Sequence, residues 1–132
     1  MNHYKFRQDP GKWNALGTMK FIFPNKYSVY LHDTPHHELF KNNRRAYSHG
    51  CVRLSDPEAL AVFLMGGQTN KWDRSRVGEI VDSSKRTVVR LPERIPVHLT
   101  YLTSWYDENE LLHFNKDIYK RDKKLQMALN IK

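Results

Sequence analysis

The stretch YSHGCVRL, residues 47–54, contains the only cysteine in the chain. Cys51 lies between a His-Gly pair and a Val-Arg pair. Upstream, the stretch YLHDTP, residues 30–35, places His32 at the end of an apolar, strand-like run. After Arg53 the sequence changes to helix signals, so the loop that carries Cys51 is expected just before a helix N-terminus.

Composition indicates one folded domain or part of one. The chain has 132 residues, of which 39% are hydrophobic and 27% charged, as in an ordinary soluble protein. We find no apolar run near the ~20 residues that a membrane-spanning helix needs. The opening MNHYKFRQDP lacks an apolar core, so we expect no secretory signal in this chain.

The net charge of +8 points to an anionic partner or to a solvated basic surface. Basic residues gather at 41–45, 84–94 and 120–124, where they alternate with acidic ones. Nucleic-acid binding would need a continuous basic stripe interleaved with aromatic residues, and we therefore expect no nucleic-acid partner. An anionic polymer such as cell-wall material remains open.

Two strand patterns and one helix pattern organise the first half of the chain. A short apolar strand is expected at 19–23, and strict alternation predicts a second strand at 27–33. Residues 36–47 are expected to form a polar excursion. A capping box with Ser55 as N-cap predicts a helix that Gly66-Gly67 ends.

The second half shows weaker signals. Helical character is weak around 76–83, and alternation predicts a strand over 94–105. The sequence DENE at 107–110 predicts a hairpin turn with a return strand at 111–114. A basic terminal helix is expected at 116–129. We therefore predict a mainly β domain with one or two packed helices.

A thiol becomes a useful nucleophile only with help from its surroundings. A free cysteine has a pKa near ~8.5, so little of it is thiolate at neutral pH. Gly50 allows a sharp turn that brings backbone N–H groups close to a reacting centre, as oxyanion stabilisation requires. His32 is the candidate base, and Tyr30, two residues earlier on the same face, can present its hydroxyl to the same pocket.

Other interpretations of these residues stay open at this point. A lone cysteine is often a small buried hydrophobe, and His49 can serve only to bond the backbone. A zinc site has suitable ligand types, but none shows the short regular spacing of a zinc motif. The residues in question are His32, Asp33, His36, His37, His49 and Cys51. For His3, His98 and His113 we expect surface positions.

Together, YSVYLHDTP at 27–35 and SHGCVR at 48–53 resemble the active-site signature of the L,D-transpeptidase catalytic domain, the YkuD-type family. The signature is a histidine, a spacer of this length, and Ser-His-Gly-Cys followed by an apolar residue and Arg. The resemblance extends to 9–35, IPVHLTYLTSW at 95–105 and DIYKRD at 117–122, as in the long Gram-negative branch. It covers about residues 6–130.

The resemblance implies a cysteine acyltransferase acting on peptidoglycan tetrapeptide stems, as donor and as acceptor. Cys51 would form a thioester with release of D-alanine, and an acceptor amine would then give a 3→3 cross-link. His32 would be the base, while Gly50, Cys51 and Tyr30 would supply the oxyanion hole. Ser48 and His49 would shape the loop, and Arg53 would orient it or bind a carboxylate. No metal and no cofactor are expected, and carbapenems are the implied inhibitors.

The resemblance also implies a β-sandwich whose N-terminal strands are absent from this chain. We therefore expect residues 1–132 to be a single, incomplete domain, located in the periplasm or cell wall like the family. Two alternatives remain: an L,D-carboxypeptidase that resolves the same thioester with water, and a non-catalytic fragment that binds peptidoglycan. A papain-like peptidase is disfavoured because its histidine would follow the cysteine.

Overall fold

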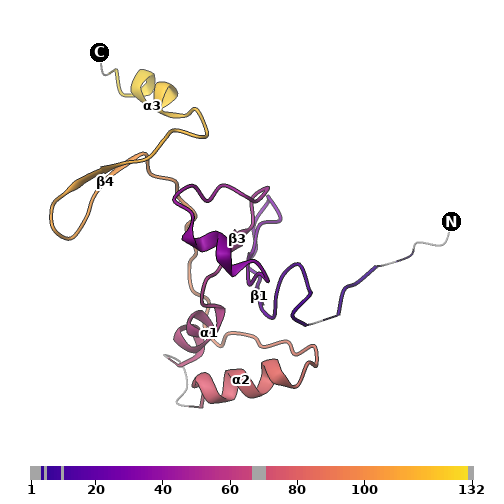
Figure 1. Ribbon diagram of the computed structural model, residues 1–132. Helices are drawn as coiled ribbons and strands as arrows, with labels where there is room; N and C mark the ends of the chain where they lie inside the picture. The colour runs from indigo at the N-terminus through magenta and orange to yellow at the C-terminus, as the bar shows by residue number, and fades with distance from the viewer. Residues whose placement is uncertain (1–3, 5, 10, 67–70, 131–132) are drawn as a thin grey trace. The chain divides into compact units, whose positions relative to one another are not determined.

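The computed structural model describes residues 4, 6–9, 11–66 and 71–130. The chain divides into two compact units, Met1–Ile95 and Pro96–Lys132. Figure 1 shows the order of their helices and strands along the chain. The residues singled out for chemistry all lie in the first unit.

A three-stranded sheet forms the centre of the first unit. It consists of β1 (Lys20–Phe21), β2 (Leu31–His32) and β3 (Val52–Arg53), in the spatial order β1-β2-β3. β1 pairs antiparallel with β2, and β3 pairs parallel with it. The two strands predicted before residue 35 are therefore present, but both are shorter than the alternation suggested.

The second strand is short because a turn occupies the first part of its predicted range. The side-chain oxygen of Asn25 accepts hydrogen bonds from the backbone N–H groups of Tyr27 and Val29. Its amide donates to the Val29 carbonyl at 2.6 Å. Ser28 has a φ of 54°, which a strand does not allow. An asparagine that bonds its own backbone thus outweighs the alternating pattern.

The connection from β2 to β3 contains one short 3₁₀ helix, η1 (His37–Lys41). It follows Pro35, which agrees with the prediction that the chain leaves the strand through a loop. Because β2 and β3 are parallel, this excursion must carry the chain back to the starting end of the sheet. Cys51 is its last residue before β3.

Two helices follow the sheet. α1 (Pro57–Gly66) begins where a helix was predicted, but Asp56 and not Ser55 is its cap. The Asp56 side chain accepts from the Ala59 N–H at 2.9 Å, and Pro57 takes the first helical position, where its missing N–H costs nothing. The helix was predicted to end at Gly66-Gly67; Gly67 lies outside the described residues.

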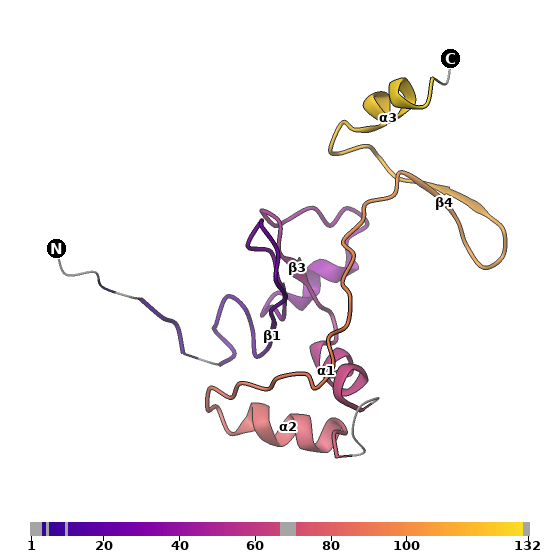
Figure 2. The ribbon, with the colours of Figure 1, turned by 180° about the vertical axis from the view of Figure 1, so that it is seen from behind.

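α2 (Arg74–Asp82) begins earlier than the weak signal at 76–83 suggested. Its N-cap Asp73 accepts from the Arg76 N–H at 2.8 Å. Arg74 also bonds the Asp56 carboxylate at 2.5 Å, which ties the first turn of α2 to the cap of α1. The two helices lie side by side in both views (Figures 1 and 2).

The buried residues of the first unit fall into two groups. Met65 of α1 and Val77 of α2 are the buried hydrophobic side chains among the described residues. The other group is polar: His32, Asp33 and Thr34 are 5%, 6% and 2% exposed. Among the described residues, the segment around the end of β2 is therefore strongly enclosed, and it carries the candidate base.

The second unit is built on a hairpin of β4 (Ser104–Tyr106) and β5 (Leu112–Phe114). The predicted turn and return strand are confirmed. The terminal helix, α3 (Asp122–Ala128), covers only the second half of its predicted range. His113, expected at the surface, is half-exposed but paired: it lies 2.8 Å from the Asp107 carboxylate and stacks on Trp105.

The predicted strand over 94–105 is wrong for most of its length, since only 104–106 is strand. Its alternating apolar residues, such as Val97 and Leu99, are exposed. None of the described residues pairs with the backbone of 95–102 as a neighbouring strand. A strand needs a neighbour for its N–H and C=O groups, and alternation alone does not supply one.

The helices account for 26% and the strands for 10% of the structure, so a mainly β fold is not confirmed. What is present is a few short strands in two sheets, with three α-helices. No helix in the described part of the chain is long and apolar enough to cross a membrane.

Candidate active site

The register of the three-stranded sheet brings the candidate site residues onto one face. His32 pairs with Lys20 on one side and with Arg53 on the other. Directly paired residues point to the same face of a sheet, and so do residues two apart on one strand. Tyr30 and Cys51 therefore share that face with His32. The backbone hydrogen bond from Val52 N–H to the Tyr30 carbonyl, 3.1 Å long, fixes the register of the two segments.

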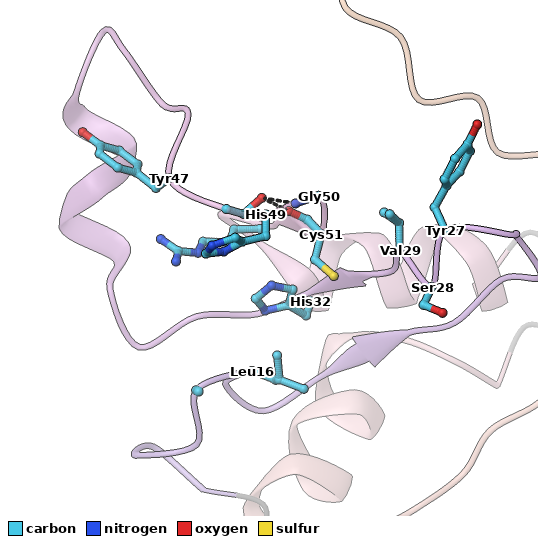
Figure 3. A pocket seen from close by; sticks show the side chains of 12 residues that line it. Leu16, Tyr27, Ser28, Val29, His32, Tyr47, His49, Gly50 and Cys51 are labelled. Carbon is cyan, nitrogen blue, oxygen red and sulfur yellow. Dashed lines mark hydrogen bonds between the residues drawn. The ribbon is translucent and has the colours of Figure 1, made fainter. Parts of the chain in front are cut away.

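A hydrogen bond from one ring nitrogen to the backbone orients the His32 imidazole. Its Nδ1 lies 2.5 Å from the backbone carbonyl oxygen of Asp33. A carbonyl oxygen can only accept, so in the neutral ring Nδ1 carries the proton and Nε2 keeps the lone pair. Figure 3 shows the His32 ring near the Cys51 sulfur, and both residues line one cavity. The arrangement is that of a thiol beside an oriented base.

A cavity of about 420 Å³ opens at this pair. Figure 3 places Tyr27 and Val29 on one side of the Cys51 sulfur and His49 on the other. Arg53 also lines it, so the wall combines apolar surface with a permanent positive charge. A substrate that presents a carboxylate beside its reacting carbonyl would match this lining.

Burial raises the pKa of Tyr30 above its usual value, and hydrogen bonding to the Cys51 side chain and the negative charge of its thiolate add to this effect. The Lys20 ammonium lies 3.6 Å from the centroid of the tyrosine ring, and the ring edge contacts His32 at a centroid distance of 5.7 Å. The phenol thus stays protonated and can donate a hydrogen bond at the cysteine.

The loop before Cys51 is braced by Ser48. The serine hydroxyl donates to the Cys51 carbonyl at 2.5 Å and accepts from the Gly50 N–H at 3.2 Å. Gly50 has a φ of 150°, and a Cβ there would lie 3.3 Å from a methyl group of Val29. Only glycine adopts this conformation without strain. In this structure the Gly50 N–H is engaged by Ser48, so its expected place in an oxyanion hole stays a prediction.

The remaining predicted residues lie at the edge of the cavity. His49 is exposed, and Arg53 is half-buried. Sequence reasoning did not single out Lys20, and it considered Asp33 only as a metal ligand. Lys20 lies within the apolar strand expected at 19–23. Its pairing with His32 could not be predicted from a local pattern, because the two residues belong to different segments of the sequence.

The side chains considered as zinc ligands make other contacts in the structure. Within the described ranges, no three side chains of His, Cys, Asp or Glu gather as a metal-binding group. Asp33 instead bonds Thr18 and pairs with His37, while His36 contacts Glu38.

Comparison with known proteins shows the family of the chain. The family model of the L,D-transpeptidase catalytic domain, YkuD, matches residues 1–91, which include the whole site. A Haemophilus influenzae protein named "Putative L,D-transpeptidase" is 35% identical over 125 residues, which is 95% of this chain. The matched region spans only 25% of that relative. The chain belongs to the L,D-transpeptidase catalytic domain family.

Proposed function

We propose that this chain carries the catalytic centre of an L,D-transpeptidase that cross-links peptidoglycan stem peptides. The observation that supports it best is the anchored His32 ring, whose free Nε2 is left for the thiol of Cys51. Cysteine acyl transfer needs such a base, an oxyanion donor and an open acyl pocket. Each of the three has a counterpart around Cys51.

In the first step, the Cys51 proton passes to His32 Nε2, and the sulfur attacks the carbonyl that joins a diamino acid to terminal D-alanine. The tetrahedral oxyanion forms beside the Tyr30 hydroxyl and the N–H of Cys51, with Gly50 as a further donor if Ser48 releases it. The C–N bond then breaks. D-alanine leaves with the proton from His32, and the stem stays on Cys51 as a thioester.

In the second step, an amine of a neighbouring stem attacks the thioester carbonyl. His32 removes the amine proton and returns it to the sulfur as the C–S bond breaks, so the enzyme is regenerated and a 3→3 cross-link results. No cofactor enters either step. Arg53, which lines the cavity, would bind a donor carboxylate, and Ser48 and His49 would shape the loop that presents Cys51.

The proposal places the protein in the periplasm or at the cell wall, where its substrate lies. The net charge of +8 suits an anionic wall polymer. A second candidate is the L,D-carboxypeptidase reaction, in which water resolves the same thioester. The half-exposed position of Cys51 favours it, because water can reach the thioester carbonyl.

The deciding experiment is intact-protein mass spectrometry after incubation with a carbapenem, with Cys51→Ala as the matched control. We expect one covalent adduct that the substitution abolishes. An adduct that persists in Cys51→Ala would overturn the assignment. Product analysis on a tetrapeptide donor then separates the candidates: a cross-linked dimer supports the transpeptidase, and a tripeptide with free D-alanine supports the carboxypeptidase.

A further inference from the structure

Asp33, the residue after the candidate base, is held by an unusual set of contacts. Its side chain is buried, and one carboxylate oxygen, Oδ2, accepts from the Thr18 N–H at 2.8 Å and from the Thr18 hydroxyl at 2.9 Å. Its own N–H donates to the Met19 carbonyl at 2.9 Å. The backbone and the side chain of Asp33 are thus both tied to the segment that leads into β1.

Gly17 is shaped to receive this carboxylate. It has a φ of 62°, and a Cβ built there would lie 2.3 Å from Asp33 Oδ2. That distance is far inside van der Waals contact, so any side chain at Gly17 would displace the carboxylate. The turn before β1 and the carboxylate therefore fit together as one unit.

The second oxygen, Oδ1, is buried and has no hydrogen bond among the described residues. Nε2 of His37 lies 3.3 Å from this oxygen, on a side chain that is 53% exposed. A buried carboxylate with one half-satisfied oxygen costs free energy relative to an amide or an apolar side chain. Stability alone therefore gives little reason for an aspartate here.

We propose that the Asp33 carboxylate is a positioning group for His32. The carbonyl that accepts the Nδ1 proton of His32 belongs to Asp33 itself. By clamping Asp33 to Thr18, the carboxylate fixes the direction of that carbonyl, and through it the tautomer and the orientation of the imidazole. The inference rests on the proposed function only in taking His32 as the base for Cys51.

The direct test is nitrogen NMR of the His32 imidazole in the wild-type chain and in three variants. We expect protonation at Nδ1 in the wild type and in Asp33→Asn, whose amide oxygen can still accept from Thr18. In Asp33→Ala and in Gly17→Ala we expect a mixture with protonation at Nε2. An unchanged Nδ1 tautomer in a folded Asp33→Ala would overturn the proposal.

The reactivity of the Cys51 thiol gives a second readout. Alkylation of Cys51 by iodoacetamide at neutral pH should slow by about tenfold in Asp33→Ala and recover in Asp33→Asn. Asp56→Ala serves as the control, because it removes a helix cap outside the cavity. Equal slowing in Asp56→Ala would show a general loss of structure and overturn the positioning role. Where Asp33→Ala does not fold, Thr18→Val removes the hydroxyl donor alone and should slow alkylation in the same direction.

The two proposals fail in different ways. A wild-type chain that takes no carbapenem adduct, yet loses the Nδ1 tautomer in Asp33→Ala, would contradict the proposed function and support the positioning role. A carbapenem adduct that forms as fast in a folded Asp33→Ala as in the wild type would support the proposed function and contradict the positioning role.

Discussion

Leu31 and Val52 face each other across the parallel strands β2 and β3, and this register brings the two chemical residues of the chain together. His32 follows Leu31, and Cys51 precedes Val52, so each lies one residue from the pair. The bonds from Val52 N–H to the Tyr30 carbonyl and from Leu54 N–H to the His32 carbonyl hold this register. The site is therefore a property of the sheet and not of the loop alone.

The Tyr30 hydroxyl is expected to assist thioester formation. Tyr30→Phe removes the hydrogen bond at Cys51 and should lower the rate of carbapenem acylation by about 100-fold, the effect of losing one oxyanion donor. Stopped-flow fluorescence or timed mass spectra would measure the rate. Tyr106→Phe, on the exposed face of the hairpin, is the control and should leave it unchanged. An unaffected rate in Tyr30→Phe would remove Tyr30 from the mechanism.

The titration of Tyr30 should report on Cys51. In Cys51→Ala the hydrogen bond and the thiolate charge are lost, so the pKa of Tyr30 should fall below its wild-type value. Burial, the largest cause, remains, and the pKa should therefore stay above that of a free tyrosine. Carbon NMR of the phenol across alkaline pH would measure it. An identical pKa in the two proteins would mean that the hydroxyl does not contact the sulfur in solution.

Two glycine substitutions should have opposite effects on stability. Gly50→Ala forces a Cβ into a positive-φ position against Val29, and should cost about 1 kcal/mol of unfolding free energy and most of the acylation rate. Gly78→Ala, inside α2 with nothing near its Cβ, should stabilise the chain by about 0.5–1 kcal/mol. Urea unfolding would measure both. Stabilisation by Gly50→Ala would contradict the loop conformation.

Acid should weaken the β4–β5 hairpin through Asp107. The hydrogen bond from His113 and then the Leu111 N–H lower the pKa of Asp107 in the folded chain. A depressed carboxyl pKa stabilises the folded state above the unfolded pKa, near ~3.9, and this stability is lost as pH falls through the folded pKa. His113→Ala should raise the pKa of Asp107 and reduce that loss. Carboxyl-carbon NMR would show it; an unmoved pKa would contradict the pairing.

Local chemistry was largely predictable from the sequence. The hairpin turn, the helix start near residue 57 and the loop leaving β2 at Pro35 follow from caps, turns and proline, which act over a few residues. The alternation at 27–33 and 94–105 failed for different reasons. In the first range Asn25 forms a turn. In the second, none of the described residues pairs with 94–103 as a neighbouring strand.

The sequence named the candidate residues of the site but not the groups that surround them. His32 and Cys51 became candidates because their residue types suit cysteine chemistry and because the stretches around them resemble the signature of the family. The roles of Lys20, Gly17 and Thr18 depend on β1 pairing with β2, a contact between segments that no local pattern encodes. The burial of Asp33 could not be predicted either, because its contacts to Thr18 and Met19 join segments that are far apart in the sequence.

The parallel pairing of β2 and β3 also sets a lower limit on the number of residues between His32 and Cys51. Two parallel neighbours cannot be joined by a tight turn, because the chain must travel back along the sheet before it re-enters, and that takes about a dozen residues or more. Residues 33–51 are this return path. Lengthening it costs little, about 0.6 kcal/mol for each doubling. The distance in sequence between histidine and cysteine thus has a minimum set by geometry and no comparable maximum.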